Sequence, residues 1–176
     1  MSTALAQTAP QFTLPGVDGS DHSLDDYRDT PVLVLVQSCN HCPYVQAWEG
    51  RLNAVTRDYA DRGVRVVAIS SNDVSSHPED SFEEMQRRAR SQGFAFDYLY
   101  DETQEVARTL GSERTPEVFV YDGDRRLAYH GAIDDSQDVT RVSANYLRDA
   151  LDAVLAGEAP AVADTAPVGC TVKWRS

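Results

Sequence analysis

Basic residues are scarce in this sequence. Lysine and arginine together number 16 against 28 aspartates and glutamates, Lys173 is the only lysine, and the formal net charge is −12. Because a negative surface repels polyanions, this charge argues against nucleic acid or an anionic lipid surface as a partner. We therefore interpret the chain as an acidic protein whose excess carboxylates form a solvated surface.

Long hydrophobic runs are also missing. No stretch of the sequence approaches the roughly 18 consecutive apolar residues that a membrane-spanning helix needs. The opening sequence MSTALAQTAPQFTLPG has neither the basic segment nor the continuous apolar segment of a secretory signal. We therefore expect no membrane association and a cytoplasmic location.

Cysteine is rare too, with three residues in the chain, but two of them are close neighbours. Cys39 and Cys42 lie in the segment SCNHCPYV, between an apolar run and a helical pattern, and Cys170 lies near the C-terminus. Because a reducing cytoplasm disfavours purely structural disulfides, the closely spaced pair needs a chemical explanation.

The first half of the chain has the pattern of a β-α-β unit. Two nearly continuous, β-branched apolar runs, at 31–36 and 64–70, are typical of parallel strands buried on both faces. Between them, one apolar stripe has helical spacing. It consists of Val45, Trp48, Leu52, Val55 and Tyr59.

The second half adds further helices and a hairpin. Ser81 and Glu84 have the spacing of a capping box, and Gly93 is placed to end the helix that they start. A short strand, FDYLY, and a short helix ending at Gly111 come next. Two apolar runs then flank Asp122-Gly123, which predicts an antiparallel hairpin.

The last periodic segment predicts a long helix that includes Val142 and Leu155 and ends at Gly157. The complete pattern indicates an α/β sandwich, with a mixed sheet between helices, and the length suits one hydrophobic core. We assign residues 1–157 to a single domain and residues 158–176 to an irregular tail that carries Cys170.

The position of the cysteine pair favours redox chemistry. If the helix starts at about Cys39 or Asn40, the Cys39 sulfur meets unpaired N–H groups at the positive end of the helix dipole. A protonated His41 adds a second positive influence, and both lower the thiol pKa from its free value of about 8.5. Cys42 follows one helical turn later, so its sulfur is within reach of the Cys39 sulfur and the two can form a disulfide. We predict a redox-active disulfide, with Cys39 as attacking thiolate and Cys42 as resolving thiol.

The C-x-x-C at a strand-to-helix junction, followed by RTPEVFV, resembles the thioredoxin superfamily. The segment APQFTLPGVDGSDHSLDDYRDTPVLVLV is similar to the opening of its AhpC/TSA, TlpA and peroxiredoxin branch, and CNHCPYV, AISSNDV, HPED, YHGAIDD and GCTVKW resemble one redoxin subgroup. The match extends from about Pro10 to Trp174. It implies a thioredoxin-like three-layer sandwich with an N-terminal β-hairpin, and a cis-proline pair, Thr115-Pro116, facing the cysteines.

Three departures from these relatives affect the expected chemistry. Thioredoxin has tryptophan before the first cysteine and Gly-Pro between the two, whereas this chain has Ser38 and Asn40-His41. Leu33 stands where thioredoxin has a buried aspartate. Peroxiredoxins use T-x-x-C, so Cys39 replaces the threonine and Cys42 takes the place of the peroxide-attacking cysteine.

We therefore expect a thiol–disulfide oxidoreductase that acts on protein thiols or disulfides and needs no cofactor. The first alternative is a peroxiredoxin-like thiol peroxidase, an antioxidant activity with peroxide as substrate. A metal-binding module is less favoured, because C-x-x-C is half of a zinc site and no second C-x-x-C or H-x(3–5)-H occurs. Copper-binding thioredoxin-fold proteins usually have C-x-x-x-C spacing, which differs from the C-x-x-C spacing of this chain.

Several other residues have two interpretations. Glu117, next to Pro116, either accepts a proton near the thiols or points into solvent. Cys170 is either a small apolar side chain that pins the tail, which we favour, or a third redox thiol that exchanges with the pair. The remaining histidines are expected in loops or at the surface; they are His22, His77 and His130.

Overall fold

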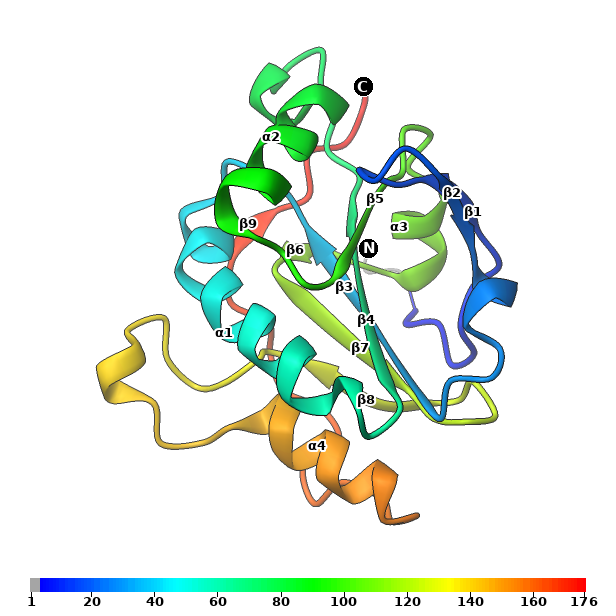
Figure 1. The fold of residues 1–176 in the computed structure, drawn as a ribbon. Coiled ribbons are helices and arrows are strands. Elements are labelled where there is room, and N and C mark those ends of the chain that lie inside the picture. The colour runs from blue at the N-terminus through cyan, green and yellow to red at the C-terminus, as the bar shows by residue number, and fades with distance from the viewer. Residues whose placement is uncertain (1–3) are drawn as a thin grey trace.

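The structure is a computed structural model that describes residues 4–176. Its central sheet has five strands in the order β5-β4-β3-β7-β8 (Figure 1). The first three in the chain are parallel, and β7 and β8 are each antiparallel to their preceding neighbour in the sheet. The strands are β3 (Val32–Ser38), β4 (Val64–Ser70), β5 (Asp97–Tyr100), β7 (Glu117–Tyr121) and β8 (Leu127–Gly131). The predicted mixed sheet and its antiparallel hairpin are confirmed.

Strand β3 is buried on both faces, and its alternate residues enter two different cores. Val34 packs among residues of α1, α2 and α4 on one face, whereas Leu35 packs with residues of α3 and the 3₁₀ helix η1 on the other. Figure 1 shows α1 and α4 on one side of the sheet and α3 on the opposite side. The helices are α1 (Pro43–Ala60), α2 (Phe82–Gln92), α3 (Glu105–Leu110), α4 (Tyr146–Leu155) and η1 (Leu24–Tyr27).

An N-terminal hairpin precedes this core. Its strands β1 (Thr13–Pro15) and β2 (Asp21–Ser23) pair antiparallel, and Gly16 forms a bridge with Leu99 of β5. The hairpin extension that the resemblance implied is therefore present. Among the described residues, no helix combines the length and the apolarity needed to cross a membrane.

Helix α1 begins later than the sequence pattern suggested. Its N-cap is Cys42, in an extended conformation with φ −67° and ψ 124°, and its first residue is Pro43. A residue that precedes proline disfavours the helical conformation, while proline at the first helical position loses no hydrogen bond. Cys42, rather than Cys39, therefore stands at the N-terminal end of α1.

Helix α4 also begins later, at Tyr146 instead of Val142. The Asp135 carboxylate accepts the backbone N–H groups of Ser143, at 2.9 Å, and Ala144, at 3.1 Å. These bonds compete with the first helical turn. Val142, with φ −65° and ψ 125°, is consequently extended despite its helical spacing.

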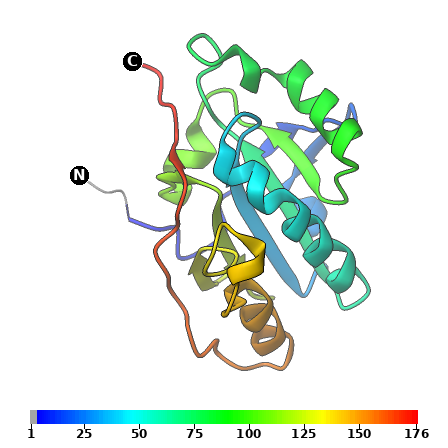
Figure 2. The ribbon, with the colours of Figure 1, turned by 90° about the vertical axis from the view of Figure 1, so that its left-hand side faces the viewer.

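The C-terminal tail folds back along the sheet edge (Figure 2). Its residues 163 and 165 exchange backbone hydrogen bonds of 3.0 and 2.9 Å with His130 of the edge strand β8. Further on, β9 (Cys170–Thr171) pairs antiparallel with β6 (Arg114–Thr115), so that Cys170 lies opposite Thr115. The expected irregular tail thus contains a short strand, and it covers an edge that would otherwise expose unpaired backbone groups.

Candidate active site

The two closely spaced cysteines lie where β3 leads into α1, opposite the Thr115-Pro116 peptide bond. That bond is cis, as the resemblance implied. Cys39 Sγ lies 3.7 Å from Thr115 Oγ1, and Cys42 Sγ lies 3.4 Å from the Thr115 carbonyl oxygen, to which the thiol donates. Cys39 and Cys42 are 1% and 0% exposed. The structure therefore brings four of the predicted site residues together, with His41 beside them.

A third sulfur joins this pair. Cys170, in β9, packs against the cluster formed by Cys39, Cys42 and Val45. Unlike the other two cysteines it is partly exposed. Both other thiols lie close enough to Cys42 to lower its pKa, so its sulfur is the shared neighbour of the three.

The surroundings of the three sulfurs shift their thiol pKa values in different directions. The hydrogen bond from Cys39, helped by Cys170 and the backbone N–H of Val45, outweighs burial and lowers the pKa of Cys42 to about 4. The bond that Cys39 gives to Cys42, together with burial and the nearby Asp80 charge, raises the pKa of Cys39. Burial and the neighbouring Cys42 raise the pKa of Cys170 to about 11. The direction of these pKa shifts favours Cys42 as the ionised sulfur, whereas the hydrogen bond to the Thr115 carbonyl requires a protonated Cys42. The assignment of the attacking thiolate to Cys39, expected from the sequence, therefore stays a prediction.

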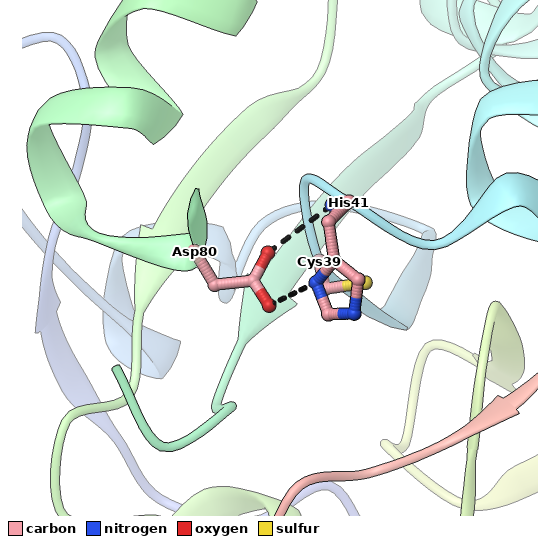
Figure 3. Close-up of side chains that lie close together, drawn as sticks. All are labelled: Cys39, His41 and Asp80. Atoms are coloured by element: carbon pink, nitrogen blue, oxygen red, sulfur yellow. Dashed lines mark hydrogen bonds and ion pairs between the residues drawn. The ribbon is translucent and has the colours of Figure 1, made fainter. Parts of the chain in front are cut away.

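A buried carboxylate that we did not single out from the sequence holds His41 in place (Figure 3). Asp80 Oδ1 accepts the backbone N–H groups of Asn40, at 2.7 Å, and His41, at 3.2 Å. Its Oδ2 lies 2.5 Å from His41 Nδ1 and accepts from Asn72 Nδ2 at 2.9 Å. Because an ionised carboxylate only accepts, the network places the Nδ1 proton of His41 toward Asp80.

Asp80 ends the 3₁₀ helix η2 (Pro78–Asp80) and has a fully buried side chain. It supplies, from a different segment, a buried carboxylate near the cysteines that Leu33 cannot supply. In the sequence, Asp80 is visible only as an acidic residue of the HPED motif, and nothing local in that motif points to His41. His77, which starts the same motif, stacks on His41 with ring centroids 5.2 Å apart.

Three of these residues also form the arrangement of a candidate metal site. One ligand atom each from Cys39, His41 and Asp80 lies within 4.8 Å of the others. Neighbouring ligands of a tetrahedral zinc ion lie about 3.3 Å apart. The 2.5 Å contact between His41 and Asp80 is shorter, so an ion held by both would have to open their hydrogen bond. We therefore describe the group as a hydrogen-bonded network.

Glu117 and His130 form a second buried ion pair. Glu117 Oε1 accepts the backbone N–H groups of Glu113 and Arg114, both at 2.8 Å, and its Oε2 lies 2.6 Å from His130 Nε2. His130 Nδ1 lies 2.7 Å from a carboxylate oxygen of Asp164 in the tail. Glu117 is 2% exposed, so it does not point into solvent, and its hydrogen bonds go to these groups. The expectation that His130 lies in a loop or at the surface is wrong, because it is buried in β8.

Comparison with solved structures places the fold in the thioredoxin-like class. The crystal structure of a hypothetical protein from Sinorhizobium meliloti 1021 matches 100% of this chain and 97% of its own, with a TM-score of 0.93 and 36% identity. A thioredoxin-family thiol:disulfide interchange protein from Chlorobium tepidum TLS shares the fold at 19% identity, with a TM-score of 0.63 over 77% of this chain and 92% of its own. The expected thioredoxin-like sandwich is confirmed.

Within that class, the chain belongs to the AhpC/TSA family, whose model matches residues 5–130. It is 34% identical over 106 residues to a Mycobacterium tuberculosis protein named as a peroxiredoxin, covering 59% of this chain and 61% of that protein. It is 25% identical over 123 residues to the thiol-disulfide oxidoreductase ResA of Geobacillus thermodenitrificans, covering 69% of this chain and 65% of ResA. The chain therefore spans less than two thirds of the length of these curated relatives. The predicted redoxin membership is confirmed.

Proposed function

We propose that this protein is a thiol–disulfide oxidoreductase in which Cys39 and Cys42 form the dithiol/disulfide couple. One observation carries the proposal: Cys39 and Cys42 pack together at the N-terminal end of α1 beside Thr115, and the neighbouring thiols lower the pKa of Cys42. A thiolate is the reactive form in disulfide exchange, so this setting favours the chemistry. The names of the two curated relatives, a peroxiredoxin and a thiol-disulfide oxidoreductase, support the same class.

In the proposed reaction the Cys42 thiolate attacks a partner protein's disulfide. A bond forms between Cys42 and one partner sulfur, the partner's sulfur–sulfur bond breaks, and the other partner sulfur leaves as a thiolate and takes a proton from solvent. Cys39 then gives up its proton and attacks Cys42, which closes the 39–42 disulfide and releases the second partner thiol. The partner gains two electrons, and the cysteine pair loses two.

His41 is the proposed acceptor of the Cys39 proton. Asp80 fixes the imidazole beside Cys39 through Nδ1, so the ring is oriented before the thiol has to ionise. The proton passes from His41 to the released partner thiolate. Asp80 is a positioning residue in this scheme, because it acts on the thiol through His41.

Trapping tests the proposal and the roles of the two sulfurs. If Cys42 attacks, the Cys39→Ser variant accumulates mixed disulfides with a disulfide-containing substrate such as insulin, through Cys42. If Cys39 attacks, as the sequence suggested, Cys42→Ser accumulates them through Cys39. Failure of the wild-type protein to reduce insulin, with no mixed disulfide in either variant, would remove the oxidoreductase proposal.

Peroxide is the second candidate substrate, and the position of Cys42 favours it. This cysteine occupies the place of the peroxide-attacking cysteine in the T-x-x-C pattern and caps α1. Attack on a peroxide would give a sulfenic acid at Cys42 and release water or an alcohol, after which a neighbouring thiol condenses with it to a disulfide. Rapid peroxide consumption with sulfenic acid found at Cys42 would establish this antioxidant activity, and slow consumption beside efficient insulin reduction would exclude it.

A further inference from the structure

We propose that Cys170 is a second resolving thiol for Cys42, so that the C-terminal segment 158–176 is a built-in reaction partner that covers the site. The inference rests on the proposed function, because it assumes that Cys42 forms a mixed disulfide. It adds Cys170 to the redox-active cysteines. The tail would then be covalently attached to α1 in the 42–170 disulfide and held only by non-covalent contacts in the other redox states.

The pairing of β9 with β6 places Cys170 at the reacting sulfur. Cys170 lies opposite Thr115 in the antiparallel register, and the Thr115 carbonyl is the group that the Cys42 thiol contacts at 3.4 Å. The Cys170 side chain packs against the Cys39–Cys42 cluster from the tail. Cys42 itself has no exposed surface, whereas Cys170 is partly exposed. A partner therefore meets the tail before it meets Cys42.

Contacts on both sides of Cys170 fix the position of its sulfur. Before it, Gly169 packs so closely that an added Cβ would lie 2.0 Å from the Thr115 carbonyl oxygen. After it, the Lys173 N–H donates to Asn72 Oδ1 at 2.9 Å, and the Lys173 carbonyl accepts from the Asp73 N–H at 2.8 Å. The thiol is thus held against Cys42 by its neighbours in the chain.

The proposed step is a resolution that competes with the one through Cys39. Cys170 loses its proton and attacks the Cys42 sulfur of the mixed disulfide. The Cys42–Cys170 bond forms, the bond to the partner breaks, and the partner thiolate takes the proton. Cys39 can then attack Cys42 in turn, which gives the 39–42 disulfide and returns Cys170 to a thiol without net oxidation. The tail is covalently tied to α1 in the first disulfide and is free in the second.

The Cys39→Ser variant isolates this step, because it leaves Cys42 and Cys170 as the remaining thiols. We expect oxidised glutathione to convert the folded variant to a Cys42–Cys170 disulfide, with loss of both free thiols and release of glutathione. The matched control, Cys39→Ser with Cys170→Ser, should stay glutathionylated at Cys42. Peptide mapping after acid quenching identifies each product, and Cys39→Ala replaces Cys39→Ser if the latter does not fold.

The outcomes separate this inference from the proposed function. If wild-type protein forms the 39–42 disulfide but Cys39→Ser stays glutathionylated at Cys42 with a free Cys170, the inference is overturned and the proposed couple stands. If Cys39→Ser forms the 42–170 disulfide while wild-type protein forms no 39–42 disulfide, the role of Cys170 as a resolving thiol stands and the proposed 39–42 couple is overturned. A 42–170 disulfide found only after denaturation also overturns the inference.

Discussion

Two histidines of this protein are held by carboxylates, but their surroundings differ. His41 is bound at Nδ1 by one buried carboxylate, Asp80, and its partly exposed ring lies beside the Cys39 sulfur. His130 is buried in the sheet, with Glu117 at Nε2 and Asp164 at Nδ1. A ring with one nitrogen occupied can still exchange a proton, whereas a ring with both occupied connects the groups on either side of it. We therefore propose that His41 takes part in proton transfer and that His130 attaches the tail to the sheet.

The largest effect expected from this comparison comes from removing the sulfur at the reactive end. Cys42→Ser should reduce insulin-reducing activity at least about 10³-fold, because an alcohol at this position does not ionise near neutral pH. His130→Gln, which changes the contact between β8 and the tail, should retain most of the activity. Steady-state rates of both variants at equal concentration check the contrast, and comparable losses in the two would contradict the division of roles.

Asp80→Asn should have the next largest effect. An amide cannot accept a proton-bearing Nδ1 and the backbone N–H groups as a carboxylate does, so His41 loses its orientation, and we expect activity to fall about 10- to 100-fold. Resolution of a mixed disulfide at Cys42 should slow and change its pH dependence, a readout that a purely structural role would not move. The structural loss is expected to be about 1–3 kcal/mol in the free energy of unfolding.

Glu79→Gln is the matched control for that change. Glu79 is adjacent in the chain and lies 3.8 Å from His41 Nδ1, but its side chain is 49% exposed. Exposed ion pairs contribute little, so this variant should keep its rate within about twofold. Equal effects of Glu79→Gln and Asp80→Asn would show that general negative charge matters, and not the placement of the imidazole.

Much of the fold could be predicted from local signals in the sequence. The apolar runs of β3 and β4, the stripe of α1 and the turn at Asp122-Gly123 are local signals, and each predicted its element. The cysteine pair for which we propose a redox role was also evident, because both cysteines stand within one short segment. Helix starts depended on competing local chemistry: Pro43 forces the residue before it to be extended, and the Asp135 side chain captures the N–H groups ahead of α4.

The contacts that refine the site are long-range. Asp80 reaches His41 across 39 positions, and Cys170 reaches Cys42 only because the tail returns to β6. No periodicity or spacing predicts such pairs in a single sequence. His130 was misplaced for the same reason, since its partners Glu117 and Asp164 come from the neighbouring strand and the tail.

His130→Gln should affect stability in a pH-dependent way. Burial lowers the pKa of His130, but its hydrogen bonds to Glu117 and Asp164 outweigh burial, and the net pKa is raised. A raised folded-state pKa contributes stability that is fully present below the unfolded value of about 6.5 and is lost as the pH rises through the folded value. The variant should therefore lose about 1–3 kcal/mol at acidic pH and less at alkaline pH. Urea unfolding at several pH values measures the difference, and a loss that grows with pH would contradict the ion pair.

The smallest expected effect comes from Asp164→Asn, which gives His130 a single carboxylate and so makes it resemble His41. The Asp164 side chain is 69% exposed, whereas Glu117 is buried, so most of the raised pKa should survive through Glu117. We expect a loss of less than about 1 kcal/mol in unfolding free energy. NMR titration of the His130 ring should give a pKa below the wild-type value but still above that of a free histidine, and amide exchange at 163–165 should become faster while exchange in β7 is unchanged. A His130 pKa at the free value would show that Asp164 dominates, and the fastening would then belong to the exposed carboxylate of the tail.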